Sequence, residues 1–68
     1  MTPKKFYRSA QKPHVEEVCK AAGTSLGNFK QIALSGGSCG KRLAEKLAQA
    51  SRGAMTELEI LYPERYES

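Results

Sequence analysis

Tryptophan is absent from this sequence of 68 residues, and cysteine and histidine are scarce. Cys19, Cys39 and His14 are the only thiol and imidazole side chains, and their spacing matches no zinc-binding pattern. Nothing in the sequence positions them as a catalytic dyad either. We therefore expect no metal site, no cofactor, no small-molecule ligand and no enzymatic activity, with Cys19 packed in the core and Cys39 an exposed thiol.

Long apolar stretches are missing as well. No run approaches the roughly 18 apolar residues that a membrane span requires, and no apolar segment near the start resembles a signal peptide. These absences predict a cytoplasmic protein with reduced thiols and no membrane partner. Residues 1–68 are expected to form a single domain that buries only about 60% of the surface of its unfolded chain.

Acidic residues are rare over most of the chain. Residues 1–56 contain ten Lys or Arg and three Glu, a net charge of +7, whereas residues 57–68 contain one Arg and four Glu, a net charge of −3. A basic body favours a polyanionic partner such as double-stranded DNA, with the acidic segment facing elsewhere. The alternative is that these charges only keep a small domain soluble.

Helix signals dominate the sequence. Thr2 followed by Pro3 is typical of a helix start, and Thr56 with Glu59 three residues later is a capping box. A strand over residues 54–61 is the competing interpretation for the last segment, and it would place Met55, Leu58 and Ile60 at a dimer edge. We expect helices over roughly residues 3–9, 12–22, 25–34, 41–50 and 56–61.

The most distinctive pattern covers about residues 14–34 and describes two helices that meet at a tight turn. Gly23 ends the first helix, because the position after a last turn often needs φ > 0. Thr24 or Ser25 can cap the second helix with a hydroxyl. The apolar residues with helical spacing are Val15, Val18, Cys19, Ala22, Leu26, Phe29 and Ile32. This pattern is that of a helix-turn-helix, whose second helix enters the DNA major groove.

A glycine-rich connection follows the motif. Gly40-Lys41 is similar to the end of a nucleotide-binding loop, but Ser35 and Arg42 stand where that loop needs glycine and a magnesium-binding Ser or Thr. No strand is expected before it. We interpret residues 35–40 as a linker that lets the Lys41-Arg42 pair approach a phosphate at the start of the next helix.

Several runs can be compared with a known family. They are Ala21-Ala22-Gly23-Thr24-Ser25, Asn28-Phe29, Gln31-Ile32-Ala33, Leu43-Ala44, and further on Gly53, Thr56, Leu58, Pro63 and Tyr66. In these runs the chain resembles phage Cro and CI-type helix-turn-helix repressors, in particular the small YdaS-like Cro proteins of prophages, over roughly residues 14–66. The resemblance implies an all-α, five-helix, lambda repressor-like fold. It also implies repression of transcription by a homodimer on a pseudo-palindromic operator, close to the nucleoid of a bacterial host.

The same resemblance assigns base readout to the start and outer face of the second motif helix. Gln31 is expected to pair with adenine and Lys30 with guanine, while Leu26 can touch a thymine methyl. Alternatives remain open: Leu26 can staple the helix start to the core, and Lys30 can contact phosphate without sequence preference. Leu26 and Gly27 stand where family members often have Gln or Ser. The readout positions are Leu26, Gly27, Lys30 and Gln31.

Phosphate contacts are expected around this helix, and they predict a steep fall of affinity with salt. Val15 stands where the family often has Gln, which leaves His14 or Lys12 to supply that contact, although His14 can equally be an ordinary surface residue. The candidates are Lys12, His14, Ser25, Asn28, Lys41 and Arg42.

A domain of this size contacts only a few base pairs, so two copies are expected on half-sites one helical turn apart. The candidate dimer residues are Met55, Leu58, Ile60 and Tyr62, for which folding back onto the core is the alternative. Two other functions stay open. One is an architectural or excision-type DNA-binding protein, and the other is an antitoxin-like interaction module that uses the acidic segment.

Overall fold

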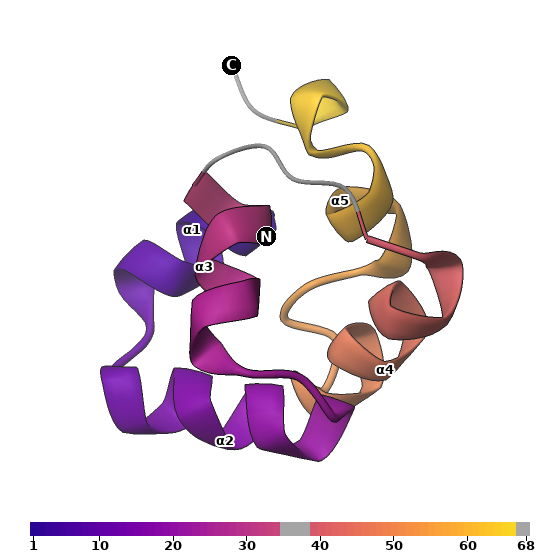
Figure 1. The fold of residues 1–68 in the computed structure, drawn as a ribbon. Helices are drawn as coiled ribbons and strands as arrows, with labels where there is room; N and C mark the ends of the chain where they lie inside the picture. Colours follow the sequence, from indigo (N-terminus) through magenta and orange to yellow (C-terminus); the bar gives the residue numbers. More distant parts are fainter. Residues whose placement is uncertain (35–38, 67–68) are drawn as a thin grey trace.

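All regular elements in the computed structural model are helices, within the residues that it describes, 1–34 and 39–66 (Figure 1). The expected all-α class and the positions of the five helices are confirmed. The strand interpretation of residues 54–61 is wrong, because most of this segment is the last α-helix. A short 3-10 helix that the sequence did not predict follows it. The elements are α1 (Pro3–Ser9), α2 (Lys12–Ala22), α3 (Leu26–Leu34), α4 (Lys41–Ala50), α5 (Glu57–Leu61) and η1 (Pro63–Arg65).

Local capping explains where the first and last α-helices start. The Thr2 hydroxyl accepts a hydrogen bond from the backbone N–H of Lys5 at 3.3 Å. At α5 the capping box is complete: the Thr56 hydroxyl accepts from the N–H of Glu59 at 3.2 Å, and Glu59 Oε1 accepts from the N–H of Thr56 at 3.1 Å. These bonds satisfy backbone donors that have no partner within the helix.

The core lies between two groups of helices. In Figure 1, α1 lies behind α3, α2 crosses beneath α3, and α4 and α5 form the other side. Phe29 and Leu47 are fully buried, and the Phe29 ring meets the Phe6 ring edge-to-face at a centroid distance of 6.3 Å. Such aromatic pairs add to the stabilisation from area burial alone. Phe29 of α3 therefore joins α1 to the motif helices.

Two of the four dimer candidates belong to this core. Met55 is fully buried and Ile60 is 3% exposed. The Met55 backbone is also fixed, since its N–H donates to the Ser51 hydroxyl at 3.2 Å. The alternative of folding back onto the core thus holds for Met55 and Ile60, which are not available as surface contacts in this fold.

The two cysteines differ less in solvent exposure than expected. Cys19 is buried on α2, as predicted. Cys39 is half-buried and packs against the core, so the expectation of an exposed thiol is wrong. Burial raises the pKa of the Cys39 thiol above its ordinary value, which lowers its thiolate fraction. Residues 35–38 of the expected linker lie outside the described residues.

Candidate nucleic-acid interface

The turn between α2 and α3 brings the two motif helices together. Gly23 has φ 79°, in the left-handed region that favours glycine, and its N–H donates to carbonyl groups of the last turn of α2. Ser25 is the cap of α3: its hydroxyl accepts from the N–H of Asn28 at 3.1 Å. The Asn28 side-chain amide donates to the Thr24 hydroxyl at 2.9 Å. The first turn of α3 is therefore held by its own polar side chains.

The outer face of α3 is a continuous stripe of exposed residues. Gly27, Lys30, Gln31 and Leu34 are all exposed and follow the spacing i, i+3, i+4 and i+7 of one helix face. We call these four residues the α3 stripe. The opposite face, with Phe29, is buried. Three of the four predicted readout residues thus share one exposed surface.

The fourth predicted readout residue, Leu26, lies elsewhere. It is half-buried and packs against the core, which agrees with the alternative that it staples the start of α3. Sequence reasoning missed Leu34, which is 39% exposed and completes the stripe. Its spacing of seven residues from Gly27 was the signal that could have identified it.

Gly27 is a glycine that the fold does not require. A Cβ added to it would meet no atom within 4 Å, and no positive φ is present there. Alanine in a helix interior is more stable than glycine by up to about 1 kcal/mol. A glycine cannot read bases through a side chain, so its contribution to a binding surface is the space that it leaves open.

The predicted phosphate contacts are spread over several elements. Ser25 and Asn28 lie at the start of α3, although their side chains already hold the turn. Lys12 and His14 are exposed at the start of α2, about 15 Å of helix away from the turn. The His14 ring also lies 5.7 Å from the Phe6 ring, at the rim of the core. The structure therefore does not gather these four residues at one place.

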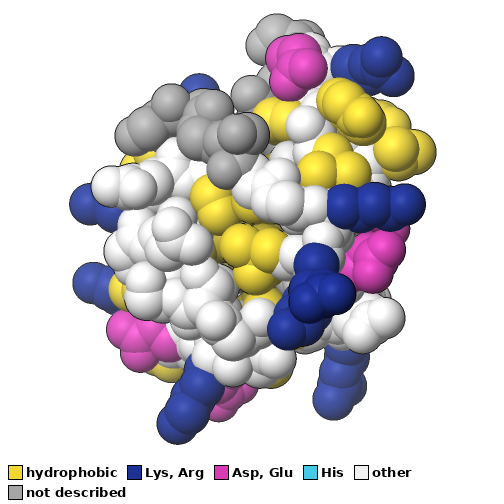
Figure 2. Space-filling view, turned by 45° about the vertical axis from the view of Figure 1, so that its right-hand side comes forward, with side chains coloured by type: hydrophobic (Ala, Val, Ile, Leu, Met, Phe, Trp, Pro, Cys, Tyr) yellow, Lys and Arg dark blue, Asp and Glu magenta, His cyan; other side chains and the backbone are white. Residues whose placement is uncertain are grey.

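Lys41 and Arg42 are exposed in the first turn of α4, as expected for phosphate contacts. In Figure 1, α4 lies on the other side of the molecule from α1 and α3. Lys and Arg side chains surround the hydrophobic side chains on the face that Figure 2 shows. This face offers separate positive charges rather than one continuous strip.

Ion pairs are rare in the part of the chain that the structure describes. Among the described residues, the single ion pair joins the Met1 amino group to Glu59 Oε1 at 2.9 Å. No Lys or Arg side chain takes part in a salt bridge in this part of the chain, which leaves these groups free to meet an anionic partner. Within the same residues, no group of His, Cys, Asp and Glu side chains could hold a metal ion. The described helices are also too short and polar to cross a membrane.

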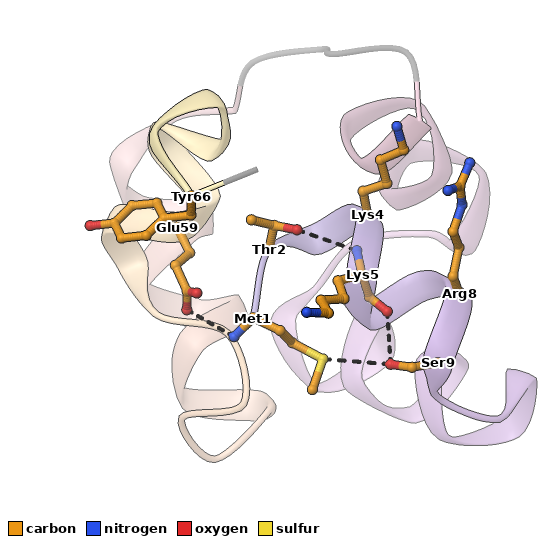
Figure 3. A pocket seen from close by; sticks show the side chains of 8 residues that line it. All are labelled: Met1, Thr2, Lys4, Lys5, Arg8, Ser9, Glu59 and Tyr66. Atoms are coloured by element: carbon orange, nitrogen blue, oxygen red, sulfur yellow. Dashed lines mark hydrogen bonds and ion pairs between the residues drawn. The ribbon is translucent and has the colours of Figure 1, made fainter. Parts of the chain in front are cut away.

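Three cations that the sequence analysis did not select lie together on α1. Lys4, Lys5 and Arg8 line a groove of about 580 Å³ between α1 and the α5–η1 segment (Figure 3). The signal for them was present in the sequence, because Lys4 and Arg8 are four residues apart and Phe6 is on a different face of the helix.

The remaining dimer candidates are exposed near the end of the chain. Leu58 is 56% exposed and Tyr62 is 43% exposed, and the Arg65 guanidinium lies 4.9 Å from the centroid of the Tyr62 ring. Tyr66, which is not one of the predicted dimer residues, is 50% exposed. Leu58 and Tyr62 therefore remain candidates for an intermolecular contact.

Comparison with known proteins adds no family to this description. No family model matches the sequence, and no match is found among curated proteins or solved structures.

Proposed function

We propose that this protein is a sequence-specific regulator that binds double-stranded DNA, of the Cro-like repressor type found in phages and prophages. The observation that carries the proposal is the α3 stripe, a mixed row of exposed residues on a helix that begins directly after the Gly23 turn. Helix-turn-helix proteins place such a face in the major groove. The Lys and Arg side chains, which form no salt bridge within residues 1–34 and 39–66, support a polyanionic partner.

The side chains of the stripe suit different base edges. The Gln31 amide can donate to N7 and accept from N6 of adenine, and Lys30 can donate to O6 and N7 of guanine. Leu34 supplies an apolar group for a thymine methyl at the far end of the stripe, a role that the sequence analysis gave to Leu26. Gly27 leaves room for the DNA to approach the helix closely.

Two copies are expected on one operator, since one domain reads too few base pairs for useful affinity. Leu58 and Tyr62 are the apolar side chains that an isologous contact between two copies can use. Arg65 lies over the Tyr62 ring in the single chain, so a dimer contact at Tyr62 has to include or displace it.

Selection of bound sequences from a random duplex library tests this function, with affinities then measured at two salt concentrations. The proposal requires an enriched site with two-fold symmetry. Gln31→Ala is expected to cost roughly 1–3 kcal/mol on that site and little on random duplex. Gln49→Ala is the matched control, because Gln49 is also an exposed helical glutamine but lies on α4.

The outcome also decides between this function and the alternatives. Strong salt dependence without an enriched sequence would favour an architectural DNA-binding protein, to which the many unpaired cations are suited. Equal losses for Gln31→Ala on selected and random duplex would contradict base readout by Gln31. Copurification of a basic protein partner, with no DNA binding, would favour the antitoxin-like module.

A further inference from the structure

The groove on the outer side of α1 is a concave surface that is rich in cationic side chains. Lys4, Lys5 and Arg8 come from α1, and Glu59 and Tyr66 close the groove from the α5–η1 side. Figure 3 shows Lys4 and Arg8 extending in the same direction from the helix. The groove encloses about 580 Å³.

Among the described residues that line the groove, the single side-chain carboxylate is already engaged. Glu59 Oε1 accepts hydrogen bonds from the Met1 amino group at 2.9 Å, the Thr56 N–H at 3.1 Å and the Thr56 hydroxyl at 3.0 Å. Within the described lining, the charges of Glu59 and the Met1 amine cancel, so Lys4, Lys5 and Arg8 together leave +3. A concave surface with this charge attracts anions.

This groove faces away from the α3 stripe. Phe6 and Tyr7 of α1 pack on Phe29, each with a ring-centroid distance of 6.3 Å, and Phe29 lies on the buried face of α3. Lys5 and Arg8 occupy the side of α1 away from this contact, and half-buried Lys4 lies on its flank, because successive helical residues are rotated by about 100°. The α3 stripe and the groove are thus on opposite sides of the α1–α3 pair.

We propose that the α1 groove is a second phosphate-binding surface, which holds the backbone of a DNA segment other than the one contacted by α3. This inference rests on the proposed function, since it takes DNA as the ligand. Lys4 and Arg8 are separated by about 6 Å along the helix axis. The Lys4 ammonium is a compact donor for phosphate oxygens, and the Arg8 guanidinium is a forked one. The groove offers charge and few groups for reading bases, so its contacts position DNA without sequence preference.

A two-duplex capture assay tests the inference. A palindromic duplex carrying the selected site is immobilised and saturated with the full chain, so that every α3 is occupied, and a labelled duplex without the site is then added. Wild type is expected to capture the second duplex. Lys4→Gln/Arg8→Gln is expected to weaken capture on the order of tenfold or more at 0.1 M salt and to lower its salt slope by about 2. Affinity for the immobilised site should change much less.

The control variant Lys20→Gln/Lys46→Gln removes the same charge from exposed positions on α2 and α4. Equal loss of capture in this variant would overturn the inference, and so would wild type that binds the selected site but captures no second duplex. Groove-dependent binding to vesicles containing phosphatidylserine, without duplex capture, would assign the groove to a membrane surface instead. Absence of any selected site would contradict the proposed function alone, because Lys4→Gln/Arg8→Gln would still show whether the groove binds random duplex.

Discussion

The α3 stripe and the α1 groove are both exposed helix faces with basic residues, but their compositions differ. The stripe mixes one cation, one amide, one apolar side chain and a glycine. The groove side of α1 presents Lys4, Lys5 and Arg8 with hydroxyl groups beside them. A mixed row of donors, acceptors and methyl groups can discriminate between bases, whereas a row of cations responds to phosphate alone. Positive charge by itself therefore does not distinguish a face suited to reading bases from one suited to binding phosphate.

The largest expected effect comes from the residue that joins the two faces. Phe29→Ala removes the ring that packs on both Phe6 and Tyr7, and truncation of a fully buried Phe costs about 3–5 kcal/mol. We expect the free energy of unfolding in urea to fall by this amount and both surfaces to lose binding together. A loss below about 1 kcal/mol would show that α1 and α3 are not coupled through Phe29.

Two smaller effects of opposite sign, on stability and on DNA affinity, are expected at Gly27 in the α3 stripe. Gly27→Ala should raise the free energy of unfolding by about 0.5–1 kcal/mol, since its Cβ meets no neighbour in the chain. The same methyl group should lower affinity for the selected site on the order of tenfold, if DNA comes close to the helix. Urea unfolding and duplex titration measure the two quantities.

Gly40→Ala is the control for this prediction, because a Cβ at Gly40 also meets nothing within 4 Å, but the residue caps α4. Any effect of Gly40→Ala should be equal on selected and random duplex, because the neighbouring Lys41-Arg42 pair is expected to contact phosphate without sequence preference. Unaltered binding by Gly27→Ala would show that the glycine provides no needed clearance, and the stripe would then contact DNA through its three side chains only.

The smallest expected effect concerns the carboxylate of the α1 groove. The hydrogen bond from the Met1 amine, together with those from Thr56, lowers the pKa of Glu59 below its ordinary value of 4.5. A carboxyl whose pKa is lower in the folded state stabilises the fold above its unfolded pKa, and this contribution disappears as pH falls through the folded value. Urea unfolding should therefore show a loss of stability below about pH 4.5 that is smaller in Glu59→Gln.

Glutamine at this position keeps an oxygen for the capping box and removes only the charge. Glu45→Gln serves for comparison, because Glu45 is exposed on α4 and forms no ion pair among the described residues. If the pH dependence is the same for wild type and Glu59→Gln, the Met1–Glu59 pair does not contribute to stability in solution.

Most of the helical framework could be predicted because its signals are local. The Thr2 and Thr56 caps, the glycine after α2 and the apolar spacing of α2 and α3 each involve residues within about one or two helical turns. Of the four readout positions that the family resemblance implies, Gly27, Lys30 and Gln31 lie on one exposed face, whereas Leu26 does not. The caps, the turn and the apolar spacing each involve neighbours in the chain, so they can be recognised without knowledge of the tertiary structure.

Burial and the relation between distant segments could not be predicted in this way. Leu58 and Ile60 belong to the same apolar segment, yet Leu58 is 56% exposed and Ile60 is 3% exposed. Cys39 follows a run of glycine and serine but packs against the core. Each outcome depends on which remote helix covers the segment. The hydrophobic effect is non-directional, so the hydrophobicity of a segment does not reveal which helix that is.

The sequence by itself determined the five helices, the caps at Thr2 and Thr56, the turn at Gly23, and three of the four residues on the outer face of α3. Only the tertiary structure decided that Met55 and Ile60 fill the core, and that the cations of α1 line a groove away from the α3 stripe. The physical reason is the distance along the chain between the residues that interact. Helix hydrogen bonds and caps join residues a few positions apart, whereas the packing of Phe6 on Phe29 joins segments far apart in the chain and orients every other face of α1.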